Sequence, residues 1–153
     1  MLETPHVIVG AAIATKVVHP ALAIPLALAS HFLLDAIPHW NPHLNSETNK
    51  LGKPTKRTTT IVITDVLVSL GAGFLITFRF LPDVRHAALV IICCFAAVLP
   101  DVVEGPYFFL GKRNEIIKKW ISMHKAIQSD TSFLLGTATQ VFVVGASLWW
   151  IFT

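Results

Sequence analysis

Charged residues are scarce in this chain, and their scarcity excludes an ordinary soluble domain. Only 14% of the 153 residues are Asp, Glu, Lys or Arg, whereas 54% are hydrophobic; about a quarter of the residues of a typical soluble domain are charged. A bilayer core requires about 20 apolar residues per helix, so this length allows four or five spanning helices. We therefore expect an integral membrane protein with a single transmembrane helical domain over residues 1–153.

Several motifs that would indicate other functions are missing. The two cysteines, Cys93 and Cys94, are adjacent, a spacing that suits neither a mutual disulfide nor a CxxC metal pair. We therefore expect both cysteines to be small hydrophobic residues of the core. There is no nucleophile elbow, phosphate-binding glycine loop or dinucleotide fingerprint. Nothing resembles a base-reading motif, so no nucleic-acid partner is expected. No cleavable signal peptide is recognisable at the N-terminus, which we expect to be retained.

The apolar pattern predicts an all-α polytopic bundle of about five helices plus one interfacial amphipathic helix. Thr4 is expected to cap the first helix, and Ser129, Asp130 and Thr131 the last one. A loop is expected over residues 41–57, and Gly105-Pro106 is expected to end the fourth helix. Gly71 and Gly73 would permit close helix packing and make a homo-oligomer possible. The predicted helices cover residues 5–18, 20–37, 58–80, 84–103, 114–127 (amphipathic) and about 132 to the C-terminus.

Positive charge predicts the orientation of these helices. Nine of the twelve Lys and Arg residues fall in the connections that follow the second and the fourth helix. By the positive-inside rule these connections are cytoplasmic, and so is the N-terminus. The nine residues are Lys50, Lys53, Lys56, Arg57, Lys112, Arg113, Lys118, Lys119 and Lys125.

Imidazoles and carboxylates gather at the predicted cytoplasmic helix ends. They are expensive in lipid unless they are paired or bind a cation, so the sequence predicts a site there. His31 and Asp35, four residues apart, share one helix face. The predicted metal ligands are His6, His31, Asp35, Asp65 and Asp101. His39 and His124 are expected to complete the ligand set or to act as general base or acid, and Glu104 lies at the same end.

Some polar residues are expected to lie outside the site. His19 and His86 fall at the opposite helix ends. Asp83 is expected to be a helix N-cap, as is Asp130, and His43 a solvated loop residue. Gln140 is expected to form an interhelical hydrogen bond.

Two short resemblances point in the same direction. Thr4-Pro5-His6 with Gly10, Leu99-Pro100-Asp101 and the later His124 resemble the small prokaryotic inner-membrane proteins described as metal-dependent hydrolases. In this chain Asp101 is followed by Val-Val-Glu104 rather than by the Asp-His of the commoner pattern. Separately, His31-Phe-Leu-Leu-Asp35 is similar to the zinc-binding helix of zinc-dependent phospholipase C and the related single-strand nucleases. Both resemblances imply a hydrolase. The first implies a location in a prokaryotic inner membrane, and the second implies that His31 and Asp35 bind zinc.

The preferred hypothesis is a membrane-embedded, metal-dependent hydrolase that acts on a phosphate ester or lipid headgroup at the cytoplasmic leaflet. Imidazole and carboxylate ligands favour Zn²⁺ or Mn²⁺, and the expected partner is a membrane lipid or a lipid-linked phosphate. One alternative is a subunit of a proton or divalent-cation transporter or channel. Another is a non-catalytic membrane scaffold held together by a structural polar or metal cluster.

Overall fold

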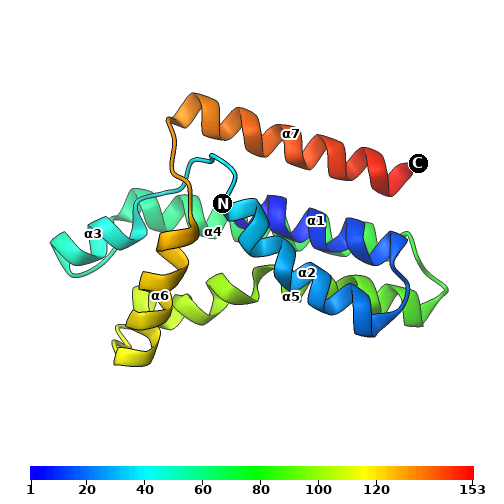
Figure 1. The fold of residues 1–153 in the computed structure, drawn as a ribbon, viewed down its shortest axis with the longest axis horizontal. Helices are drawn as coiled ribbons and strands as arrows, with labels where there is room; N and C mark the ends of the chain where they lie inside the picture. The colour runs from blue at the N-terminus through cyan, green and yellow to red at the C-terminus, as the bar shows by residue number, and fades with distance from the viewer.

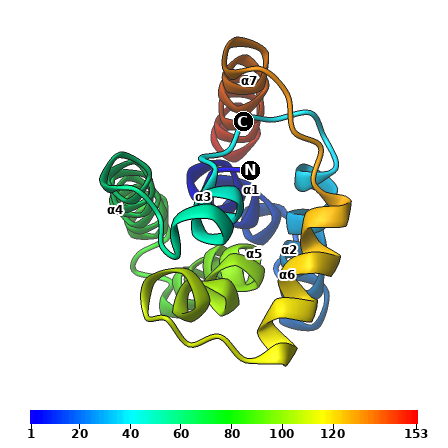
Figure 2. The same ribbon diagram turned by 90° about the vertical axis from the view of Figure 1, so that its left-hand side faces the viewer.

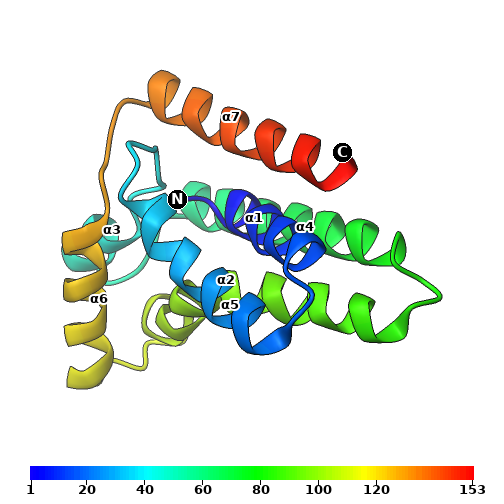
Figure 3. The ribbon, with the colours of Figure 1, turned by 45° about the vertical axis from the view of Figure 1, so that its right-hand side comes forward.

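The computed structural model describes residues 1–153 and contains seven helices and no sheet. Helices α1, α2, α4, α5 and α7 run roughly lengthwise through the molecule, while α6 crosses the bundle at the end where the short α3 also lies (Figures 1 and 3). The chain terminates at the other end of the bundle. In chain order the helices are α1 (Glu3–Lys16), α2 (Pro20–Asp35), α3 (Leu44–Leu51), α4 (Lys56–Phe78), α5 (Val84–Phe109), α6 (Glu115–Ile127) and α7 (Phe133–Phe152).

Helix α1 forms the centre of the bundle because its small side chains allow close packing on every side. It contacts α2, α4, α5 and α7, which surround it in the end-on view of Figure 2. Ala11, Ala12 and Ala14 are buried, and the main apolar core continues through Val90 and Cys93 of α5. Both cysteines are buried and unbridged, as expected. This packing holds the polar N-terminal turn of α1 at the centre of the bundle end where α3 and α6 lie.

Three helices are long and apolar enough to cross a membrane, namely α4, α5 and α7, and α2 is a shorter apolar helix. The predicted all-α membrane architecture is thus supported, although this count is smaller than the expected five spans. The difference arises from α1 and α2, which have 14 and 16 residues, fewer than the roughly 20 that a bilayer core requires.

The expected loop at residues 41–57 was wrong in part, because it contains the helix α3. This helix has no apolar period that would reveal it. Its position depends on Glu47, whose carboxylate accepts hydrogen bonds from the Thr55 backbone nitrogen (2.7 Å) and the Thr58 hydroxyl (2.9 Å). These contacts join α3 to the start of α4, a tertiary effect that local sequence does not encode.

Gly105-Pro106 does not end α5, which continues through Pro100 and Pro106 to Phe109. The extension is stabilised by packing, since Tyr107 and Phe108 form a second small core with Ile121 of α6. Burial of large aromatic side chains contributes about 1.5–3 kcal/mol each, which can offset the hydrogen bond lost at a proline.

Two predicted helix caps were also wrong. Asp83 caps α5 as expected by accepting from the backbone nitrogens of its first turn. In contrast, α1 begins before Thr4 and receives its cap from Asp65 of α4, and α7 begins at Phe133 after Ser132. Asp130 instead forms an ion pair with Lys125 and lies in a backbone bridge to the segment that follows α2.

Gly10 marks the closest approach of α1 to α5 and provides a test of the packing. A Cβ atom at this position would lie 2.6 Å from the Cys93 carbonyl oxygen, whereas one at Gly71 would meet nothing within 4 Å. We expect Gly10→Ala to lower the melting temperature in detergent, because overpacking a core costs about 1–3 kcal/mol. Gly71→Ala should match or exceed the wild type. Equal melting curves for the two variants would contradict this packing.

Candidate metal centre

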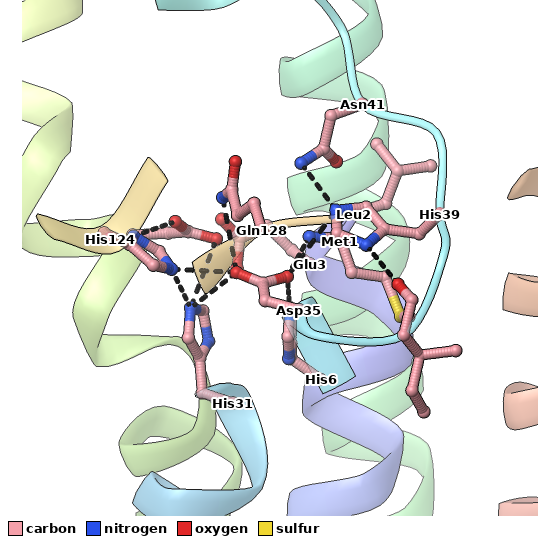
Figure 4. A network of polar contacts seen from close by, with 12 residues as sticks. Met1, Leu2, Glu3, His6, His31, Asp35, His39, Asn41, His124 and Gln128 are labelled. Atoms are coloured by element: carbon pink, nitrogen blue, oxygen red, sulfur yellow. Dashed lines mark hydrogen bonds and ion pairs between the residues drawn. The ribbon is translucent and has the colours of Figure 1, made fainter. Parts of the chain in front are cut away.

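The carboxylate of Asp35, at the last turn of α2, lies at the centre of a buried cluster of polar side chains (Figure 4). Its exposed fraction is 0%. One oxygen faces His124 and His31, and the other faces His6, His39 and the amino-terminal nitrogen of Met1. The Gln128 amide donates to the first oxygen at 3.3 Å. Four imidazoles from four different segments therefore converge on one carboxylate.

His31 is held in the tautomer that suits a metal ligand. Its Nδ1–H donates to the Ala97 carbonyl oxygen of α5 at 2.7 Å. The proton on Nδ1 leaves Nε2 with a lone pair, and this atom is 3.5 Å from Asp35 Oδ2. Ligating histidines commonly use a backbone carbonyl in this way to fix ring orientation.

His124 comes from α6 and joins two carboxylates. Its Nε2–H donates to Asp35 at 2.8 Å and its Nδ1–H to Glu104 at 2.8 Å. Burial disfavours the charged ring, but these two hydrogen bonds raise the pKa of His124 to about 10. In the protein alone, the ring is thus an imidazolium between two carboxylates. It lies on the buried side of the amphipathic helix, whose prediction at residues 114–127 is confirmed.

Three atoms of this cluster are spaced as metal ligands are. His124 Nε2 is 2.8 Å from Asp35 Oδ2 and 3.1 Å from His31 Nε2, and the latter two atoms are 3.5 Å apart. Donors bound to tetrahedral Zn²⁺ at 2.0–2.1 Å lie about 3.3 Å from one another. The group can therefore hold a metal ion with little movement of the helices.

His6 supplies an independent indication of a ligand. It is fully buried, it stacks on the His31 ring at a centroid distance of 4.1 Å, and neither ring nitrogen has a hydrogen-bond partner. Its Nε2 is 3.4 Å from Asp35 Oδ1. Leaving a buried polar group without a partner costs about 1–3 kcal/mol. A cation bound between the imidazoles and the Asp35 carboxylate would give the His6 ring the partner that it lacks.

His39 lies on the loop that follows α2 and is fixed by the backbone around it. Its Nδ1–H donates to the Ile37 carbonyl at 2.8 Å, and its Nε2 is 3.7 Å from Asp35 Oδ1. Burial lowers the pKa of His39, so the ring is neutral. The same segment pairs with the linker before α7: Ser129 N donates to Asp35 O, and Thr131 N donates to His39 O.

Asp101 and Glu104, near the end of α5, form the wall of the cluster on the α6 side. Asp101 Oδ2 is 3.9 Å from His31 Nε2, and Asp101 Oδ1 is 3.7 Å from His124 Nδ1. Glu104 was expected only as a residue at the same helix end. Its direct bond to His124 exists because α5 continues beyond the predicted end.

Asp65, by contrast, is not among the residues that the cluster brings together. Both of its oxygens accept bonds from the first turn of α1, at 2.5 Å from Glu3 N and 2.6 Å from the Thr4 hydroxyl. This carboxylate therefore acts as a helix cap in the structure. His19 and His86 lie at the opposite end of the bundle, as expected; His86 bonds there to the Ala14 carbonyl.

A pocket of about 480 Å³ leads to the cluster from the end of the bundle where α3 and α6 lie. Its walls include Asp101, Glu104 and His124 on one side and the polar face of α3 with His43 on the other. The chain therefore places a ligand-type cluster at the base of an accessible pocket. Sequence patterns gave no indication of Gln128 or of the Ala97 carbonyl, because neither is of a residue type that stands out in an apolar helix or a polar linker.

Comparison with known proteins adds no assignment to this geometry. No protein-family model, curated protein or solved structure matches the chain.

Proposed function

We propose that this protein is a membrane-embedded, metal-dependent hydrolase of phosphate esters carried by membrane lipids. The observation that carries the proposal is the buried group of His31, Asp35 and His124, spaced for a metal and adjoining an accessible pocket. Such concave sites with converging polar groups are typical of enzymes.

Zn²⁺ or Mn²⁺ is the proposed cofactor, because imidazole and carboxylate donors favour both. His31, Asp35 and His124 would hold the ion, with His6 and Asp101 beside them. A divalent ion at this place would lower the pKa of a bound water and stabilise negative charge on phosphoryl oxygens.

Residues of the chain would perform the remaining tasks. His39 is neutral, and its Nε2, 3.7 Å from Asp35 Oδ1 and 3.1 Å from the Asn41 amide, would have to exchange the Asn41 contact to accept a proton. Glu104 orients the His124 ring through Nδ1.

The proposed orientation places the site at the cytoplasmic leaflet of a prokaryotic inner membrane. Lys50 of α3 and Lys118, Lys119 and Lys125 of α6 are all exposed at the end of the bundle that holds the site. Positive charge favours the cytoplasmic side and attracts anionic headgroups. We propose that α1 and α2 are inserted with α4, α5 and α7, giving five lengthwise segments, and that α6 lies in the interface.

A transport role has less support, because the polar groups do not continue through the bundle. Gln140 accepts from Leu2 N, just before α1, and donates to the Trp40 carbonyl of the loop after α2, so its partners lie near the site and not in another helix or in the opposite half. The other half offers Thr77, whose hydroxyl is already bonded to the Gly73 carbonyl. An ion path normally needs polar groups at several depths.

The proposal is tested by phosphate release from lipid phosphates in mixed micelles. The purified protein should release phosphate, lose this activity after a chelator removes the metal, and regain it with Zn²⁺ or Mn²⁺ but not with Ca²⁺. Absence of hydrolysis from a folded, metal-loaded protein would refute the enzyme. If the same protein moved protons or Mn²⁺ across liposome membranes, the transport alternative would replace it.

A further inference from the structure

We infer that the centre binds two divalent cations, one on each side of the His124 ring. This inference rests on the proposed function and concerns the number and the position of its metals. Asp101, Glu104 and His124 form a second group, whose ligand-type atoms lie within 4.8 Å of one another, as do those of the first group. The two groups share only His124, which offers Nε2 to one and Nδ1 to the other.

The distances in the second group come from two turns of α5. Glu104 Oε1 is 2.8 Å and Asp101 Oδ1 is 3.7 Å from His124 Nδ1. The residues lie three positions apart on one helix face, which places both carboxylates over the same spot. Occupancy of both positions would require the His124 ring to lose the two protons that it donates to Asp35 and Glu104. Both protons would leave to solvent, and the ring would bridge the two cations as an imidazolate.

Asp101 connects the two positions. One of its oxygens faces His31 and the other faces His124 Nδ1, at 3.9 and 3.7 Å. A carboxylate with its two oxygens turned toward separate groups of donors can bridge two ions. An ion at the pocket-side position would act as a Lewis acid on a phosphoryl oxygen.

The charge of the pocket supports a second cation. Five carboxylates line the pocket, from Glu3, Asp65, Asp101, Glu104 and Asp130, whereas its cationic groups are Lys125, the His124 imidazolium and the amino group of Met1. The amino group of Met1 is paired with Asp35, and His124 with Asp35 and Glu104. Lys125 is already paired with Asp130. Without further positive charge such walls would repel a phosphate group. The second position lies on the pocket side, since its three residues all line the pocket, whereas His31 and Asp35 do not.

Elemental analysis of tag-free protein in detergent, titrated with Zn²⁺ or Mn²⁺ and freed of excess metal, tests the inference. We expect two equivalents per chain in the wild type and one in Glu104→Gln. Glu115→Gln, which alters an exposed glutamate of α6, is the control and should keep two. Two Mn²⁺ ions that share His124 should also give a spin-coupled electron paramagnetic resonance spectrum, which requires no variant.

The outcomes separate the second ion from the proposed function. One equivalent in both the wild type and Glu104→Gln would overturn the inference and leave a mononuclear hydrolase. Glu104 would then only orient His124, and Glu104→Gln would bind its single metal ion about 10–100-fold more weakly than the wild type. Two equivalents in Glu104→Gln would overturn the assigned position. No bound metal in the wild type would overturn both proposals.

Discussion

Asp35→Asn is expected to abolish metal binding and hydrolysis while leaving the chain in the membrane. The substitution preserves volume but removes the charge on which His6, His31, His39 and His124 converge. Removing one partner of a buried ionic contact costs about 3–5 kcal/mol. We expect metal content to fall to background and lipid phosphate hydrolysis to fall by more than about 100-fold. This loss is larger than the roughly 10–100-fold loss that follows substitution of a residue that only orients a metal ligand.

Asp83→Asn is the matched control for this experiment. Asp83 is an exposed N-cap of α5, and asparagine is an equally good cap. Metal content, activity and melting temperature should therefore all equal those of the wild type. A folded Asp35→Asn protein that keeps its metal and its activity would contradict the site. If the wild type hydrolyses no lipid phosphate and Asp35→Asn only lowers the melting temperature, the result would favour the non-catalytic scaffold held together by a structural cluster.

Gly136→Ala is expected to be the most destabilising alanine substitution at a glycine of the bundle. A Cβ atom at this position of α7 would overlap the Trp40 backbone nitrogen and the His39 carbonyl carbon. Backbone atoms cannot rotate away, so the loop would have to separate from α7. We expect a loss at or above the upper end of the 1–3 kcal/mol typical of overpacking, together with weaker metal binding because His39 would move.

Gly145→Ala, in the same helix, provides the comparison. Its Cβ atom would meet nothing within 4 Å, and alanine is favoured over glycine in a helix by up to about 1 kcal/mol. The two variants should thus shift the unfolding midpoint in opposite directions in a detergent denaturation series. Similar midpoints for both would show that α7 does not pack against this loop.

The lengthwise helices were predictable because long apolar runs have few alternatives in a membrane protein. The amphipathic helix α6 was also predictable, since Trp120, Ile121 and His124 share one face. The apolar spacing places Ile116, Ile117, Trp120 and Ile121 on one stripe of this helix, but it does not distinguish which of them are covered, and 80% of Ile116 is exposed. Only the position of α6 against α5 determines that difference.

The residue types in the sequence predicted which side chains could join the cluster. Tertiary contacts decide which of these side chains actually lie in it. Asp65 and Asp101 looked alike in the sequence, as acids near the ends of apolar helices. In the structure the turn of α1 that starts at Glu3 lies against Asp65 and occupies both of its oxygens. Asp101 meets His31 and His124 instead. Their roles as metal ligands stay predictions until metal content is measured.

The pairing of the segment after α2 with residues 129–131 has a consequence for biogenesis. Backbone bonds join Asp35 and His39 to Ser129 and Thr131, and His124 lies just upstream of this linker. While these later residues are still inside the ribosomal exit tunnel, the tip of α2 stands in the nascent protein without its neighbour. Assembly of the cluster must therefore wait until residues 124–131 have emerged from the ribosome, and a chain arrested after α5 would leave Asp35 without its bond to His124.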